Sequence, residues 1–166
     1  DGSRLTLGAD AQWADYKTWT DAGRRETGND SRSSQYGLFA QEEWLTGPWV
    51  LRGGARLVWT AHDINRLGGA APGDEDASWT RLLWSVGARY NGWNGVAPFV
   101  NVGSSFMAPA LKSVGGTLRP EDRGVPGRNG QLPNPGLDPE SGIGADAGLQ
   151  FICPKGYLAT VRGFVN

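Results

Sequence analysis

Apolar and polar residues alternate with a period of two along most of the chain, and apolar residues at helical spacing are hard to find. In the third alternating segment, Leu51, Leu57 and Trp59 share one face, while Arg52 and Arg56 share the other. This period is that of a strand with one apolar and one polar face. The alternation predicts an all-β protein with strands at residues 5–19, 35–45, 49–62, 79–90, 96–105, 142–153 and from 157 onward.

The connections between these strands alternate in length. Polar segments at residues 21–34, 63–78 and 107–141, which we predict to be long loops, alternate with short turns rich in Gly, Pro and Asn. This alternation is typical of an antiparallel up-and-down meander with small turns at one rim and large loops at the other. We therefore expect a single domain over residues 1–166, built as a meander of seven to eight strands.

The polar face carries charges in the middle of strands, and two architectures accommodate them. The mid-strand charged residues are Arg52, Arg56, Arg81, Arg89, Asp146 and Arg162. A soluble β-sandwich would expose them to water outside, whereas a membrane barrel would turn them toward a wet lumen. The eight Trp residues fall mainly near the predicted strand ends, where rings with a polar edge form interfacial girdles. This placement favours the membrane barrel.

Composition excludes several classes of function. The 166 residues suffice for one domain or part of a larger one. Sixteen basic and seventeen acidic residues give a net charge of -1, so nucleic acid is not an expected partner. One cysteine and one histidine exclude an internal disulfide and His-pair zinc sites. No segment reaches the ~18 apolar residues of a membrane helix, and the first residues lack the layout of a signal peptide.

Catalytic and metal-binding patterns are weak. His62 is the single histidine, no Gly-x-Ser-x-Gly motif is present, and the adjacent Glu42 and Glu43 point to opposite faces of a strand. The acidic run at 74–76 lacks further ligands at calcium-site spacing, which favours a solvated loop. We interpret His62 as exposed polar surface, with contact to a chelated metal or cobalamin as the alternative, and Cys153 as a buried or lipid-facing side chain. We expect no enzymatic activity, no cofactor and no metal site.

Four segments carry distinctive motifs. Residues 36–44 read YGLFAQEEW, 87–90 read GARY, 106–112 read FMAPALK and 134–141 read NPGLDPES. In this order they resemble the Tyr-Gly-x-Phe-x-Gln-(Asp/Glu)-Glu-Trp, Gly-x-Arg-Tyr, Phe-Arg-Ala-Pro-x-Leu and Asn-Pro-x-Leu-x-Pro-Glu segments of TonB-dependent outer-membrane receptors, with Met107 where Arg is usual. The residues that carry the resemblance are Tyr36, Gly37, Gln41, Trp44, Phe106, Pro109, Leu111, Asn134, Pro135, Leu137, Pro139 and Glu140.

The resemblance covers essentially the whole chain but only the middle to later part of the family's barrel. It implies a bacterial outer-membrane receptor that takes up a scarce nutrient of the iron-siderophore or cobalamin class. It also implies that the chain is a barrel fragment without a plug, because no plug sequence is present and the chain does not end on a terminal aromatic residue. The implied partners are the remaining barrel, the plug, the TonB system acting through that plug, and outer-membrane lipid.

Further expectations follow from this resemblance. The motif residues between 106 and 140 would shape the longest outer loop. Arg52, Arg56, Arg81 and Arg89 would face the lumen, where they would steer an anionic ligand or pair with carboxylates for structure alone. Seven strands fall far short of the roughly 22 of a plugged transporter. Alone, the chain should therefore curl into a smaller closed barrel or pair its open edges with another copy.

Two alternatives stay open on sequence grounds. The first is a secreted soluble β-sandwich that binds carbohydrate through exposed Trp rings, which would need one buried apolar face. The second is a complete small outer-membrane protein of eight strands, which fits the length but not the family motifs.

Overall fold

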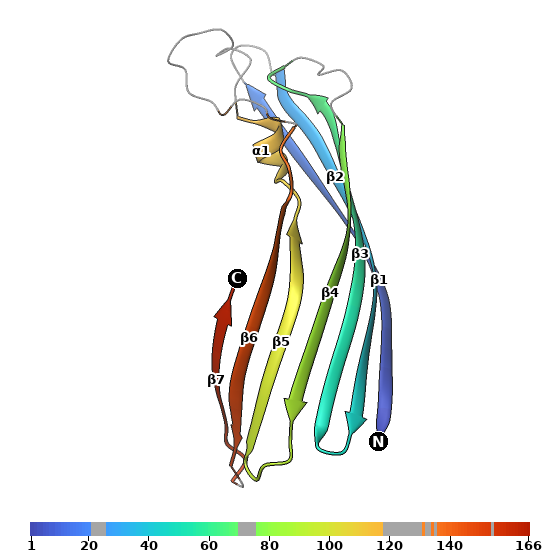
Figure 1. Ribbon diagram of the computed structural model, residues 1–166. Helices are drawn as coiled ribbons and strands as arrows, with labels where there is room; N and C mark the ends of the chain where they lie inside the picture. Colours follow the sequence, from blue (N-terminus) through green and yellow to red (C-terminus); the bar gives the residue numbers. More distant parts are fainter. Residues whose placement is uncertain (21–25, 70–75, 118–130, 132–133, 135, 154) are drawn as a thin grey trace.

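The computed structural model describes residues 1–20, 26–69, 76–117, 131, 134, 136–153 and 155–166. Its seven strands form one antiparallel sheet in chain order, and each strand neighbours the next (Figure 1). The elements are β1 (Gly2–Thr20), β2 (Glu26–Thr46), β3 (Trp49–Arg66), β4 (Ala77–Tyr90), β5 (Val96–Met107), α1 (Leu111–Gly115), β6 (Glu140–Ile152) and β7 (Leu158–Val165). The predicted all-β meander is confirmed.

Short turns connect the strands at one end of the sheet (Figure 1). β2 turns into β3 through Gly47, at φ +53°, and β4 turns into β5 through Gly95, at φ +73°. These left-handed conformations favour glycine because it has no Cβ. The long connections leave the opposite end of the sheet, which we call the outer end because outer-membrane barrels place their longer loops outside the cell.

The two faces of the sheet differ in chemistry. Residues directly opposite each other in register share a face, so the ladder Leu38, Leu57 and Leu82 marks one side. All three are exposed, as are many other large apolar side chains on this outer face, among them Leu5, Leu7, Leu51, Val86, Val100 and Ile143. The opposite, inner face carries the ion pairs described below. Each strand therefore presents lipid-like surface on one side and polar surface on the other.

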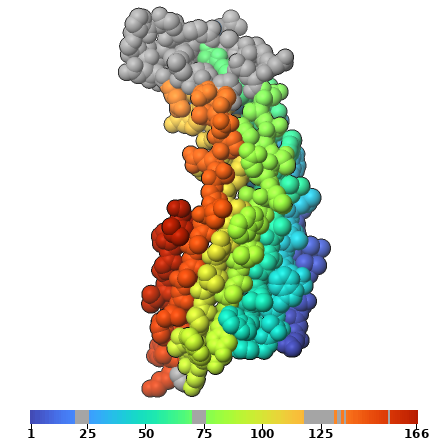
Figure 2. Space-filling view, viewed as in Figure 1, coloured from blue at the N-terminus to red at the C-terminus, as the bar shows by residue number. Residues whose placement is uncertain are grey.

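The sheet is curved but open. Helix α1 follows β5, yet it contacts β1, β2 and β3, so the inner face curls around it. β1 and β7 are the edges of the sheet, and β7 (red in Figure 2) ends partway along the wall. The sheet is therefore neither a small closed barrel nor a sandwich, because the described residues provide no second sheet to cover the apolar face. None of the described helices is long and apolar enough to cross a membrane.

The outer strand ends differ from the sequence-based prediction. The segments predicted as loops at 21–34, 63–78 and 107–141 are partly strand: β2 begins at Glu26, β3 continues to Arg66, β4 begins at Ala77, β5 includes Met107, and β6 begins at Glu140. The third segment also contains helix α1. Both faces of the strands carry polar residues here, so the alternation that identifies a half-apolar strand is lost. Residues 21–25, 70–75, 118–130 and 132–133 lie outside the described part.

Burial is concentrated at the outer end, where α1 covers the inner face. Val114 of α1 is fully buried, and Val58 and Ile64 of β3 are nearly so. Polar side chains are buried in the same region, namely Asn29, Ser31, Thr60 and His62. Asn29 connects three segments there: its amide donates to Thr18 Oγ1 at 3.1 Å and to the Gly116 carbonyl at 3.4 Å, and its Oδ1 accepts from Gly68 N at 2.9 Å.

Candidate functional site

Two rows of aromatic side chains cross the outer face. In the upper row, Trp13 lies edge-on to Tyr36 with ring centroids 6.0 Å apart, and Tyr36 stacks on Trp59 at 5.4 Å. In the lower row, near the short turns, Trp49 lies 4.8 Å from Tyr90. These rings lie in adjacent strands at matching heights. Such rows are typical of the aromatic girdles at both surfaces of a membrane barrel.

The spacing of the two rows matches the thickness of a membrane. Trp59 lies ten positions after Trp49 on β3, and Trp44 lies eight positions after Tyr36 on β2. At about 3.3 Å per residue and a strand tilt of about 40°, these spans are about 25 Å and 20 Å along the membrane normal. The apolar band of an outer-membrane barrel is about 25 Å tall. The rows therefore bound the lipid-facing part of the sheet.

Charged residues begin directly beyond the upper row. Asp15 pairs with Arg32 at 2.9 Å and Lys17 pairs with Asp30 at 3.1 Å, on strands that continue past Trp13 and Tyr36. The hydrogen bond from Arg32 lowers the pKa of Asp15 below its usual value. The outer face therefore changes from apolar to charged at the level expected for a lipid boundary.

The prediction that the tryptophans lie at strand ends is only partly right. Trp13 and Trp59 lie within long strands, because β1 and β3 continue beyond the membrane boundary. Trp79 belongs to the inner face rather than to a girdle, since its ring packs edge-on against His62 at 5.0 Å. Sequence alone gave no way to tell where the strands leave the lipid.

The inner face is lined by ion pairs that join neighbouring strands. Glu43 of β2 accepts from Arg52 of β3 at 2.6 Å and from Arg4 of β1 at 3.3 Å. Near the other edge, Asp146 of β6 accepts from Arg162 of β7 at 2.7 Å and from Asn101 of β5 at 3.0 Å. In the described part of the chain, no further element covers this region of the inner face. The ion pairs therefore help to keep neighbouring strands in register there.

The four arginines predicted to face the lumen all lie on the inner face, but their partners differ. Arg52 pairs with Glu43, and Arg56 pairs with Asp10 at 2.7 Å. Arg81 instead places its guanidinium 5.8 Å from the centre of the Phe106 ring and donates to the Thr80 carbonyl. Arg89 donates to Asn91 Oδ1 at 2.8 Å. Within the described residues, neither Arg81 nor Arg89 has a carboxylate partner.

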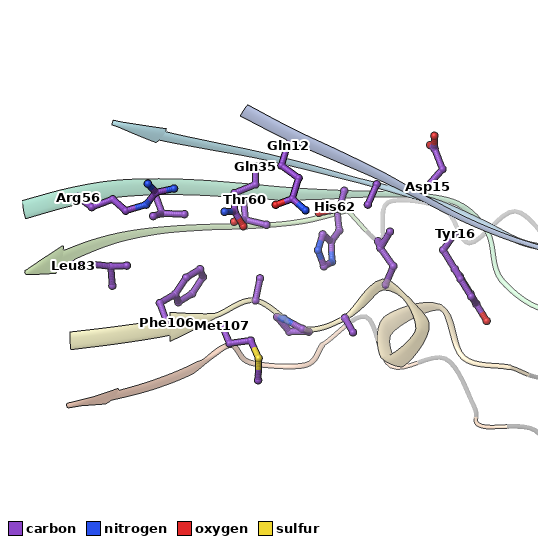
Figure 3. A pocket seen from close by; sticks show the side chains of 17 residues that line it. Gln12, Asp15, Tyr16, Gln35, Arg56, Thr60, His62, Leu83, Phe106 and Met107 are labelled. Atoms are coloured by element: carbon purple, nitrogen blue, oxygen red, sulfur yellow. The ribbon is translucent and has the colours of Figure 1, made fainter. Parts of the chain in front are cut away.

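A cavity of about 540 Å³ lies on the inner face beneath the segment that leads into α1 (Figure 3). Strands β1 to β4 form its walls, and residues 106–111 close its far side. Apolar residues, including Val58, Leu83 and Phe106, line one part of it, and Gln12, Gln35 and Thr60 line another. We call it the α1 cavity. No cluster of three or more His, Cys, Asp or Glu side chains suited to a metal ion occurs in the described part of the chain.

Two polar atoms of β3 are buried at this cavity without hydrogen-bond partners among the described residues, namely Nδ1 of His62 and Oγ1 of Thr60. The His62 side chain is only 2% exposed, so the prediction that it forms part of the exposed polar surface is wrong. Burial lowers the pKa of its imidazole below the usual value. Thr60 is 1% exposed. No sequence motif predicted these two residues, because the residues that bury them are distant in sequence.

The comparisons with known proteins bear on what this wall belongs to. A family model described as "TonB dependent receptor-like, beta-barrel" matches residues 2–166. The chain belongs to the TonB-dependent receptor family. Proteins of this family form barrels in the bacterial outer membrane, which is where this receptor segment resides. A search of curated proteins finds no match.

One solved structure similar to this receptor segment carries the name "Copper transporter OprC". The two chains superpose with a TM-score of 0.71 at 18% sequence identity. The match covers 99% of this chain and 27% of that one, so the receptor segment spans about a quarter of the neighbour's length. At this identity the likeness concerns the fold.

The receptor-family motif residues occupy distinct places in the wall. Tyr36 and Trp44 lie on the outer face, and Gln41 lines a second cavity on the inner face. The α1 cavity is lined in part by Phe106, Pro109 and Leu111. The backbone N–H of Asn134 donates to the Val114 carbonyl at 2.9 Å. Leu137 and Pro139 lead into β6, which begins at Glu140. Gly37 lies beneath the Arg56–Asp10 pair. Pro135 lies outside the described residues.

Other predicted sites are less informative. Cys153 is exposed, which overturns the buried alternative and leaves the lipid-facing one as a prediction. Of the acidic run at 74–76, only Asp76 is described, and its Oδ1 accepts from Ile64 N at 3.1 Å. Asp76 therefore has a structural contact at the outer end of β3.

Proposed function

We propose that this chain supplies part of the lumen wall of a receptor that takes up a scarce nutrient in a TonB-dependent manner. The observation that carries this proposal is the division of the sheet into a lipid-matched outer face and a polar inner face. The inner face bears ion pairs along its length and the α1 cavity at its outer end. In the whole receptor, the open edges β1 and β7 pair with further barrel strands, and a plug fills the lumen. An isolated chain pairs its edges with another copy.

The nutrient belongs to the class of organic metal chelates, such as an iron-siderophore or a cobalamin. The mixed polar and apolar lining of the α1 cavity supports this proposal, because its volume of about 540 Å³ accommodates one part of an organic ligand. The similar structure is named for copper transport, which makes a copper salt the appropriate competing substrate in a test.

Ligand steering is assigned to Arg81 and Arg89 rather than to all four lumen arginines. Arg52 and Arg56 are held by Glu43 and Asp10, so their charges are balanced locally. The charges of Arg81 and Arg89 have no such balance in the described wall. They lie at opposite ends of the inner face of β4, opposite Val58 and Val50, and so can attract an anion along the lumen.

Uptake by cells tests this function. The whole receptor is expressed in a strain without its own siderophore and cobalamin receptors, with TonB present or deleted, and supplied with labelled ferric siderophores, cobalamin or copper salt. We expect TonB-dependent accumulation of one organic chelate, reduced in the Arg81→Gln variant and unchanged in Arg32→Gln, which alters an arginine on the outer face. Accumulation of the copper salt alone, or accumulation independent of TonB, would contradict the proposal.

A further inference from the structure

We infer that the α1 cavity binds an uncharged ring-bearing group that both donates and accepts hydrogen bonds, with His62 and Thr60 as its polar contacts. Figure 3 shows both side chains extending from β3 on the side of the sheet where Phe106 and Met107 lie. The inference deepens the proposed function, because it specifies the chemistry of one contact between the receptor and its ligand. Binding at this cavity does not depend on the proposed function; only the role of that binding in uptake rests on it.

The first argument is the state of the two polar atoms. His62 Nδ1 and Thr60 Oγ1 are both buried and both lack a partner in the described residues. A buried polar atom without a partner costs free energy, and proteins satisfy nearly all such atoms. Both residues line one cavity, so a single bound group can satisfy them together. A hydroxyl oxygen both donates and accepts, and a neutral imidazole nitrogen does one or the other, so a group that offers both functions can pair with both atoms in either tautomer of His62.

The second argument is the charge around the cavity. Of the charged residues at its walls, Asp15 turns its carboxylate away from the cavity (Figure 3) and pairs with Arg32, and Arg56 pairs with Asp10. His62 is neutral at pH 7, because burial lowers its pKa despite the opposing effect of Asp63. The hydroxyl of Tyr16, also at the wall, donates to the Gly116 carbonyl. None of the described residues that line the cavity therefore carries an unbalanced charge; Arg81, which has no carboxylate partner in the described wall, lies against the Phe106 ring but is not part of the lining. The lining favours a neutral group over an ion.

The third argument is the apolar part of the lining. Val58, Leu83 and Phe106 face the cavity beside the polar pair. An aromatic ring on the ligand would bury apolar surface there and pack against the Phe106 ring. A volume of about 540 Å³ leaves room for such a ring together with a polar group.

Benzamide is a suitable probe, because its ring carries a neutral amide that donates and accepts. Benzoate adds a charge at similar size, and toluene lacks the polar group. The intact receptor, purified in detergent with ¹⁵N-labelled histidine, is titrated with each probe. The His62 signal is assigned by its loss in the His62→Phe variant. We expect benzamide to shift this signal and to bind about tenfold more weakly in Thr60→Val, as the loss of a hydrogen bond predicts.

The matched control is Thr80→Val, which removes a hydroxyl from an exposed residue of the outer face and should leave benzamide binding unchanged. The inference is overturned if benzamide produces no shift, if benzoate or toluene binds as tightly, or if Thr60→Val binds benzamide as well as the original protein does. Binding in detergent needs no TonB, so failure here is distinguishable from failure of uptake.

Discussion

Arg56 of β3 reaches across the backbone of β2 to pair with Asp10 of β1, with Nη1 and Oδ2 2.7 Å apart. The residue beneath the pair is Gly37, whose register partners are Asp10 on one side and Val58 on the other. A Cβ at position 37 would lie 2.7 Å from the Arg56 Cζ and 2.8 Å from the Asp10 Oδ2. The family motif therefore places glycine where an ion pair connects strands that are not neighbours.

Replacing Gly37 with alanine should displace this ion pair. The added methyl group cannot fit beneath Arg56 unless the guanidinium moves, so the substitution should break the exposed Arg56–Asp10 pair and lower stability slightly. We expect a lower urea midpoint for Gly37→Ala in detergent or vesicles. Gly163→Ala is the control, because nothing lies within 4 Å of a Cβ at position 163. Equal midpoints for the two variants would contradict the role assigned to Gly37.

The depth of the lipid-facing band predicts how arginine is tolerated on β3. Ala55 lies midway between the aromatic rows and Ala61 lies just beyond the upper row, on the same outer face. An arginine on the lipid face costs about 2–4 kcal/mol at the bilayer midplane and about 0–1 kcal/mol near the interface. Ala55→Arg should therefore destabilise the receptor in vesicles much more than Ala61→Arg. Reversible unfolding by denaturant measures both, and similar losses would contradict the assigned boundary.

The sequence predicts the fold well between the aromatic rows and less well beyond them. Between the rows, one face meets lipid and the other meets the lumen, so the alternation identifies Leu38, Leu57 and Leu82 as a single face. Above the upper row both faces are polar, and residues such as Asp30 and Arg32 look like loop residues although they belong to β2. Alternation of apolar and polar residues reveals a strand only where its two faces meet different environments. A strand with two polar faces shows no such pattern.

The candidate site is harder to predict, because it depends on contacts between distant segments. The motif drew attention to Phe106, Pro109 and Leu111, yet it could not show that these residues face β3 across a cavity. His62 looks like an exposed histidine until residues about 45 positions later in the chain cover it. Asn29 stands in a polar run without a distinguishing signal. Its role as a connector follows only from the positions of Thr18, Gly68 and Gly116.

Asn29→Ala should loosen helix α1 from the wall. The substitution removes the acceptor of the Gly68 amide and a donor to the Gly116 carbonyl, and each lost partner at a buried site costs about 1–3 kcal/mol. Hydrogen exchange at the Val114 and Gly116 amides should become about tenfold faster or more. Asn65→Ala, at an exposed position of β3, is the control and should leave this exchange unchanged. Unchanged exchange in Asn29→Ala would show that α1 is held by other contacts.

His62 should make stability depend on pH. Burial lowers the pKa of its imidazole in the folded protein, so the unfolded state binds more protons. Stability should therefore fall as the pH drops through the unfolded value of about 6.5, and the loss should level off below the folded value. Denaturant titrations between pH 7.5 and pH 5 measure this slope, which should be smaller in His62→Phe. An equal slope in both proteins would rule out this contribution.

The central claim, that the sheet is a one-sided membrane wall, is tested most directly by spin labels at Ala40 and Gln41. These exposed neighbours on β2 point to the outer and inner faces. The labels are attached to single cysteines in a receptor in which Cys153 and any other native cysteine are replaced, because Cys153 is exposed and would react. In vesicles, the account predicts that the label at 40 is accessible to oxygen but shielded from a water-soluble nickel complex, and that the label at 41 shows the reverse. Equal access of the nickel complex to both positions would contradict it.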